Sequence, residues 1–246
     1  MVTVLVVSTK PKANTANTAP KVKASRTLTF PLVTGRSAVR LTWRSNARFK
    51  QQHPDIELRC ITTDIDLDLE RERIDLGITL GSGDYARYER WHFVDEEVFP
   101  VCSPDYLVSH PTLQLPQDVA QTTLLHLEER YRPRLDWAGW LARFGVSPPR
   151  AGKAFTFNDY SIVLQAALEG QGIALGWRHI VEPLINQGRL VRPLTQSVTT
   201  DQPMYIIASR AGRARADVMA LKDWLVQEAA AAINPPLAPG SLRATA

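Results

Sequence analysis

One stretch of the chain decides the fold: Phe155-Thr-Phe-Asn-Asp-Tyr-Ser-Ile-Val-Leu-Gln-Ala-Ala-Leu-Glu-Gly-Gln-Gly-Ile-Ala-Leu-Gly-Trp177. It has the composition of a strand end, a helix, a glycine turn and a second strand. Asn158 or Asp159 can cap the helix, because either side-chain oxygen accepts a hydrogen bond from a first-turn amide. The apolar residues at helical spacing predict its buried face. They are Ile162, Val163, Ala166 and Ala167.

The end of this stretch predicts a ligand-binding corner. Gly170 ends the helix where a left-handed residue is wanted. The apolar segment 172–176 is bounded by glycines, which is typical of a strand buried on both faces. A strand that leads into a helix N-terminus offers backbone amides to an anionic or polar ligand. No catalytic set accompanies these residues, so the stretch indicates binding.

Length and composition indicate an ordinary globular protein. The 246 residues suffice for one large or two small domains, and the chain is 44% hydrophobic and 22% charged. Cys60 and Cys102 lack metal-ligand spacing, which favours two buried free thiols and a reducing compartment over a disulfide. No apolar run approaches the roughly 18 residues of a membrane helix. The sequence predicts a cytoplasmic protein.

Charge is unevenly distributed along the chain. The first 50 residues hold ten Lys or Arg and no Asp or Glu, whereas the remainder holds 19 basic and 25 acidic residues. Such asymmetry can mark a nucleic-acid-binding arm. A solvated tail and a start region that is not native are the alternatives, and together they are favoured.

Strands and helices alternate along the rest of the chain. The strands are expected over 28–33, 56–61, 74–78, 91–102, 123–126, 188–193 and 204–209. The helices are expected over 38–52, after Ser103-Pro104, at Leu115-Pro116, over 137–144 and over 213–231. The acidic run at Asp64, Asp66, Asp68 and Glu70 lacks the glycine turn and distal Glu of a calcium loop, so we expect a solvated helix start there.

This alternation predicts an α/β protein of two lobes, with 91–102 and 204–209 as crossover strands between them. Ligands of such proteins bind in the cleft between the lobes. Four parts are expected: a disordered or non-native segment 1–26, a first lobe of 27–102 with 204–231, a second lobe of 103–203, and a flexible tail 232–246.

An ordered set of short motifs carries a family likeness over about three quarters of the chain. Besides the opening stretch they are Ala47–Ile56, Ile74–Ile78, Gly81–Asp84, Val98–Pro104, Leu124–His126, Trp137–Leu141 and Gly188–Pro193. In this order and spacing they resemble the effector-binding region of LysR-type transcriptional regulators, in the subgroup typified by the glycine-cleavage regulator. The resemblance implies a fold like that of type 2 periplasmic binding proteins, with two Rossmann-like lobes joined by two crossover strands.

The resemblance also implies a function and its partners. A small effector in the cleft shifts a homodimer or tetramer between arrangements, which alters contact with DNA. No catalysis, cofactor or metal is implied. The effector is expected to be an amino acid, a betaine-like compound or a small organic acid, since the Asn158–Tyr160 turn also resembles regulators of choline-sulfate or betaine use. Carried over by position, the effector-binding residues are Thr34, Ser37, Thr79, Gly81, Ser82, Gly83, Ser103, His126, Asn158, Asp159 and Tyr160.

Two departures from the family concern the N-terminal part. The winged helix-turn-helix that normally precedes a linker helix is missing from this sequence, so DNA would be reached only through a domain absent from the chain. The stretch from Leu32 to Trp43 also matches the family poorly. A frameshifted or mis-started gene accounts for both departures and for the acid-free first 50 residues.

Several residues keep two interpretations. His126 either donates to an anionic effector or is a hydrogen-bonded core histidine. Tyr160 and Trp177 can offer ring faces to a cationic ligand, and for Trp177 the favoured alternative is that it only packs in the core. Ser103 is expected to be an N-cap and hinge with or without a ligand role.

Two other functions stand beside the regulator. One is a stand-alone periplasmic-type solute-binding protein, which the poor signal segment and unpaired cysteines oppose. The other is a small-molecule lyase or transferase. It is opposed by the absence from the sequence of a Gly-Xaa-Ser-Xaa-Gly motif, a phosphate loop, a zinc signature and a dinucleotide fingerprint.

Overall fold

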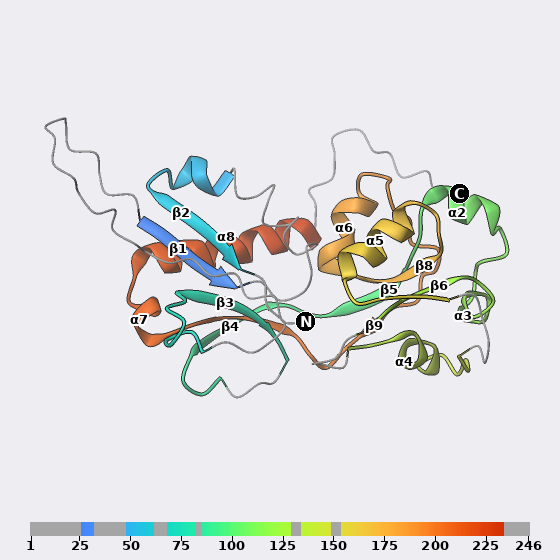
Figure 1. Cartoon of the computed structure of the whole chain (residues 1–246), viewed down its shortest axis with the longest axis horizontal. Coiled ribbons are helices and arrows are strands. Elements are labelled where there is room, and N and C mark those ends of the chain that lie inside the picture. The colour runs from blue at the N-terminus through green and yellow to red at the C-terminus, as the bar shows by residue number, and fades with distance from the viewer. Residues whose placement is uncertain are drawn as a thin grey trace, which may run out of the picture.

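The protein folds into two α/β lobes, seen side by side in the computed structural model (Figure 1). The structure describes residues 26–31, 48–61, 68–81, 85–128, 134–148 and 154–233. Two separate hydrophobic cores correspond to the two lobes, one around Phe49, Leu76 and Trp224 and the other around Val98, Trp140 and Ala174.

The first lobe is built on β1 (Arg26–Pro31), β2 (Ile56–Ile61), β3 (Leu76–Leu80), β4 (Glu89–Val94) and β10 (Met204–Ala208). β1 and β2 pair in parallel, and β10 pairs antiparallel with both β3 and β4. β1 also lies against β3. The helical residues 48–52, α7 (Arg210–Arg213) and α8 (Ala216–Ile233) complete this lobe. α8 packs its apolar face on the core through Val218, Leu221, Trp224, Leu225 and Ala229.

The second lobe contains a five-stranded sheet in the order β7-β6-β8-β5-β9. Its strands are β5 (Glu97–Val101), β6 (Leu124–Leu127), β7 (Ala154–Phe157), β8 (Ile173–Trp177) and β9 (Val198–Thr199). Its helices are α2 (Pro104–Ser109), α3 (Pro116–Val119), α4 (Trp137–Ala142), α5 (Tyr160–Leu168) and α6 (Arg178–Ile185).

Two connections join the lobes, as the sequence predicts, but each runs differently in detail. The expected strand 91–102 is two strands in two sheets, because β4 pairs with β10 and β5 pairs with β8 and β9. The chain therefore leaves the first sheet after Val94, and not after Cys102. The return connection also differs. The expected crossover strand 204–209 corresponds to β10, which lies in the first sheet, so the chain crosses between β9 and β10.

The decisive stretch folds as predicted from its pattern. β7, α5 and β8 follow one another, and the side chain of Asp159 caps α5 by accepting a hydrogen bond from the Ser161 amide. Gly170 has a φ of 68°, and all five residues of β8 are buried. One detail is wrong: Ile162 is 47% exposed, because the buried face of α5 is formed by Tyr160, Val163, Leu164 and Ala167.

Other local predictions divide into correct and incorrect ones. Ser103 caps α2 with Pro104 in its first turn, as expected. The strand expected over 188–193 is wrong, since only an isolated bridge between Val191 and Cys102 forms there. The sequence analysis also missed α6, in which an internal Pro183 obscures the helical pattern.

The acidic segment and the cysteines are described in part. Residues 69–73 form turns in place of the expected helix start, and the Asp68 carboxylate accepts hydrogen bonds from the Glu70 and Arg71 amides. Asp64 and Asp66 lie outside the described residues. Cys102 is a buried free thiol, and burial raises its pKa to about 12. The structure describes no side chain for Cys60.

Among the described residues, no helix is long and apolar enough to cross a membrane. The expectations for residues 1–25, 32–47 and 234–246, including the segment 1–26 except Arg26, concern parts of the chain outside the described ranges.

Candidate functional site

The carboxyl edge of the second sheet carries the candidate site. β6 is parallel to both β7 and β8, so these three strands end at the same edge. α5 begins at this edge, directly after β7, and the Asp159 cap fixes its first turn. Ligands of open α/β sheets bind outside the carboxyl ends of the strands, which makes this edge the candidate binding site of the second lobe.

A cavity of about 200 Å³ opens at this edge. Its walls come from β6, α5, β8 and the segment that leads into α4. The lining side chains are Leu125, His126, Leu127, Arg134, Leu135, Asp136, Trp137, Tyr160, Val163, Leu175 and Trp177. All of them belong to the second lobe. Most are apolar or aromatic, and the titratable groups among them are His126, Arg134, Asp136 and Tyr160.

Tyr160 hydrogen-bonds the backbone at the end of β8, which forms one wall of the cavity. Its hydroxyl donates to the Leu175 carbonyl (3.0 Å) and accepts from the Trp177 amide (3.4 Å). β6 pairs with β8 only as far as Ala174, so the hydroxyl takes over two backbone groups that the ladder leaves unpaired. Burial raises the pKa of Tyr160 and keeps the phenol protonated.

Trp177 and Arg134 form a second wall. The Arg134 guanidinium lies over the Trp177 ring, 5.2 Å from its centroid, and Tyr160 meets the same indole edge-on at 4.8 Å. Trp177 is only 2% exposed. The ring face considered for a cationic ligand is therefore occupied by an arginine, which favours the packing interpretation of Trp177.

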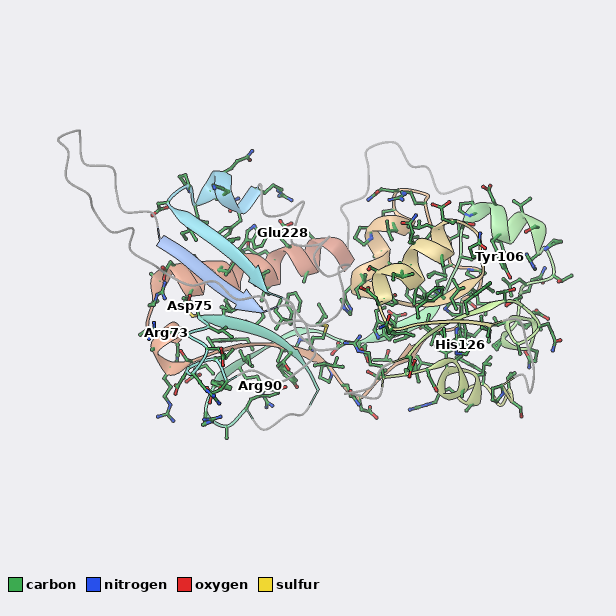
Figure 2. The ribbon with its side chains drawn as sticks, viewed as in Figure 1. Arg73, Asp75, Arg90, Tyr106, His126 and Glu228 are labelled. Atoms are coloured by element: carbon green, nitrogen blue, oxygen red, sulfur yellow. The ribbon has the colours of Figure 1, made fainter. Side chains whose placement is uncertain are left out.

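His126 and Asp136 are the other titratable groups of the cavity. Burial lowers the pKa of His126, against the opposing effect of the Asp136 carboxylate, so the imidazole is neutral at physiological pH. Asp136 caps α4 by accepting a 2.7 Å hydrogen bond from the Gly139 amide. Figure 2 shows His126 in the second lobe, far from Asp75 and Arg90 of the first.

The remaining predicted site residues lie elsewhere or are not described. Asn158 is exposed, and Ser103 is buried as the α2 cap; neither lines the cavity. In the first lobe, buried Thr79 hydrogen-bonds the Tyr85 hydroxyl, and Gly81 adopts a φ of 75°. Thr34, Ser37, Ser82 and Gly83 fall outside the described residues. The structure thus brings His126 and Tyr160 together, with Asp159 beside them.

Sequence reasoning missed Arg134, Asp136 and Trp137 as cavity residues. Asp136 carried a usable signal, since an Asp before an apolar helical pattern indicates an N-cap. Arg134 carried none, because a single arginine in a loop has no periodic context. Within the described residues no group of His, Cys, Asp and Glu is arranged to hold a metal ion.

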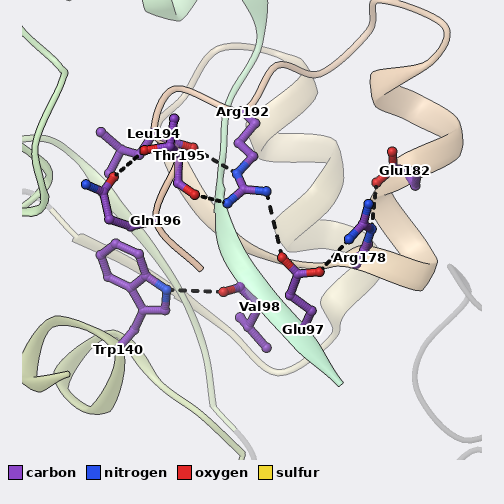
Figure 3. A network of polar contacts seen from close by, with 9 residues as sticks. All are labelled: Glu97, Val98, Trp140, Arg178, Glu182, Arg192, Leu194, Thr195 and Gln196. Carbon is purple, nitrogen blue, oxygen red and sulfur yellow. Dashed lines mark hydrogen bonds and ion pairs between the residues drawn. The ribbon is translucent and has the colours of Figure 1, made fainter. Parts of the chain in front are cut away.

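An ion-pair network beside the cavity joins β5 to the segment after α6 (Figure 3). Glu97 accepts a 2.7 Å bond from Arg178, whose Nε is 3.4 Å from Glu182. Arg192 stands 3.8 Å from Glu97 and lies over the Phe99 ring. Its guanidinium donates to the carbonyls of Leu194 and Thr195. Burial alone would raise the pKa of Glu97, but hydrogen bonds from Ser197 and Arg178 and the positive charges of Arg178 and Arg192 lower it. Arg178 and Arg192 therefore connect α6 and the segment that follows it to Glu97 of β5.

Comparison with known proteins places this architecture in a family. Residues 37–230 match the family model described as the LysR substrate binding domain. The chain is 28% identical over 183 residues to the glycine cleavage system transcriptional activator of Escherichia coli K12, covering 74% of this chain and 59% of that protein. It is 33% identical over 185 residues to the HTH-type transcriptional activator AmpR of Rhodobacter capsulatus, covering 74% and 60%.

Solved structures share the fold. The effector domain of the transcriptional regulator AmpR of Pseudomonas aeruginosa superposes with a TM-score of 0.63 at 24% identity, covering 81% of this chain and 94% of that one. The regulatory domain of CrgA from Neisseria meningitidis gives a TM-score of 0.65 at 23% identity, covering 79% and 95%. The chain spans about three fifths of the length of the curated relatives it matches. It belongs to the LysR substrate-binding domain family.

Proposed function

We propose that this chain is the ligand-sensing region of a LysR-type transcriptional regulator and that its effector binds in the cavity at the carboxyl edge of the second sheet. The cavity carries the proposal, because it combines an aromatic wall with an arginine, a histidine and a helix N-terminus. The predicted first-lobe residues Thr79 to Gly83 and the Thr34–Ser37 turn form the opposite side of the cleft in this proposal.

The size of the cavity limits the effector to a small molecule. An apolar cavity of about 150 Å³ accommodates benzene, so one of 200 Å³ suits a ligand of about ten non-hydrogen atoms. Amino acids, betaines and small organic acids all fall in this range.

The proposal is binding without catalysis. The acid of the cavity already serves the fold, since Asp136 caps α4. The matched relatives are described as transcriptional activators, which favours a regulator over a stand-alone solute-binding protein. In this proposal the protein works in the cytoplasm as a homodimer or tetramer, and reaches DNA through a domain outside this chain.

Thermal-shift screening against amino acids, betaines and small organic acids tests the ligand part. Binding at a hundredfold excess over Kd contributes about 2.7 kcal/mol, which raises the melting temperature by about 5–10 °C for a domain of this size. His126→Trp fills the cavity and should abolish the shift. Gln165→Trp, on an exposed position of α5, should keep it.

A gel shift with the full-length gene product and its upstream region tests the regulatory part. Retarded DNA whose mobility or affinity changes with the ligand is expected. A full-length protein that binds no DNA in this region, or the absence of any stabilising ligand in the screen, would count against the proposal.

A further inference from the structure

Glu96 joins the two connections between the lobes. It lies between β4 and β5, in the first connection, and is 1% exposed. Thr200, which follows β9 in the second connection, donates its amide to the Glu96 carbonyl (2.9 Å). The Thr200 hydroxyl donates to Glu96 Oε2 at 2.7 Å. One buried acid therefore ties the outgoing strand to the returning one.

The other carboxylate oxygen of Glu96 faces the cavity wall. Glu96 Oε1 is 3.6 Å from Arg134 Nη1, and the two side chains are only 2% and 5% exposed. Within the described residues Oε1 accepts no hydrogen bond. A buried ion pair offsets its desolvation only when its hydrogen bonding is good, so this contact leaves Arg134 weakly held by Glu96.

Arg134 is shared between this pair and the cavity. Its side chain lines the cavity and stacks on Trp177. A guanidinium has five N–H donors in a planar fork, and two of them match the oxygens of a carboxylate or sulfate. An anionic group that enters the cavity can therefore offer Arg134 the bidentate geometry that Glu96 does not.

We infer that the effector carries an anionic group that binds Arg134, and that Glu96 is a resident counter-ion with which this group competes. The inference rests on the proposed function and adds the chemical class of the ligand. Because Glu96 also binds Thr200, ligand affinity and the contact between the two connections are thermodynamically linked.

The neighbouring charges favour an anion over a cation. Asp136, the acid that lines the cavity, is engaged as the α4 cap. His126 is neutral and able to donate a hydrogen bond. The face of Trp177 that would attract a cation is covered by Arg134.

Three isosteric probes test the inference by calorimetry on the intact chain: benzoate, benzamide and benzamidine, which differ in charge and have about the size that the cavity admits. Wild-type protein should bind benzoate at least about tenfold more tightly than benzamide, and benzamidine most weakly. Glu96→Gln removes the competing charge and should tighten benzoate by about tenfold, with benzamide changed less than about twofold.

The paired variant Glu96→Gln/Arg134→Gln keeps a polar pair without buried charge and should lose the preference for benzoate. It is the alternative if Glu96→Gln alone does not fold. Equal binding of benzoate and benzamide by the wild type, including no detectable binding of either, overturns the inference. Uncharged or cationic ligands that bind the wild type and are lost in His126→Trp overturn the anion class but leave the ligand cavity standing.

Discussion

The Tyr160 hydroxyl hydrogen-bonds two backbone groups at the end of β8. Removing this hydroxyl measures how much these two bonds contribute to the stability of the protein. Tyr160→Phe keeps the ring and its edge-on contact with Trp177 but deletes the oxygen. The Leu175 carbonyl and the Trp177 amide then lose a buried partner each.

The expected loss follows from these two groups. A buried backbone group left without a partner costs about 1–3 kcal/mol, and the 3.4 Å contact is the weaker of the two. We therefore expect the free energy of unfolding to fall by about 2 kcal/mol and the melting temperature by about 4–8 °C. A collapse of the cavity is not expected, because the apolar packing of the ring is unchanged.

Tyr205→Phe is the matched control. Its ring packs beside Arg90 and His92, and its hydroxyl makes no hydrogen bond within the described ranges, so its loss should change stability by less than about 0.5 kcal/mol. Urea unfolding followed by tryptophan fluorescence compares the two variants. If Tyr160→Phe is as stable as wild type, or no less stable than Tyr205→Phe, the two hydrogen bonds do not support the end of β8.

Three further predictions concern local features of the fold. Gly172→Ala places a methyl group 2.5 Å from the Thr123 carbonyl oxygen. We therefore expect the free energy of unfolding, measured in urea, to fall by about 1–3 kcal/mol. A variant as stable as wild type would show that the starts of β6 and β8 can move apart at no cost. Asp159→Ala should destabilise the protein by about 1 kcal/mol, because α5 loses its N-cap. Asn158→Ala, at the neighbouring exposed position, should be nearly neutral. Equal effects of the two variants would contradict the assignment of the cap. Burial and the nearby Arg134 lower the pKa of His179 to about 3, below its unfolded value of about 6.5, so the unfolded state binds the extra proton and stability falls as the pH drops from about 6.5 towards 3. In thermal melts across this range His179→Leu should show a shallower pH dependence than wild type, and parallel curves would refute the assignment.

Local patterns in the sequence predicted most of the elements. Asp159, Gly170 and the apolar run of β8 act through neighbours a few residues away, and their roles follow from capping, a left-handed turn and burial on both faces. Ser103-Pro104 predicted the start of α2 for the same reason. The predictions failed where the local pattern was ambiguous. Segment 91–102 is continuously β-rich, and only pairing with different partners separates β4 from β5. Ile162 has helical spacing with Ala166, but the face of α5 that packs on the core is formed by Tyr160, Val163, Leu164 and Ala167.

The candidate site was predictable only in part. His126 and Tyr160 stand at the ends of recognisable elements, and both line the cavity. Arg134 and Glu96 are 38 positions apart and lie in connections, so no spacing relates them; they meet because β5 and α4 pack in one lobe. Asn158 was predicted beside Tyr160, and the backbone turn carries its side chain to solvent.

The sequence by itself determined the two-lobed α/β architecture, the family and the corner formed by Asp159, Tyr160 and β8. These depend on short-range periodicity and capping, and on the order of motifs along the chain. Only the tertiary structure decided which side chains surround the cavity and which charges share it. Glu96 contacts Arg134 and Thr200, and the separation of these residues in the sequence does not predict either contact. The free energy of each contact depends on burial and on a geometry that exists only after the strands have paired.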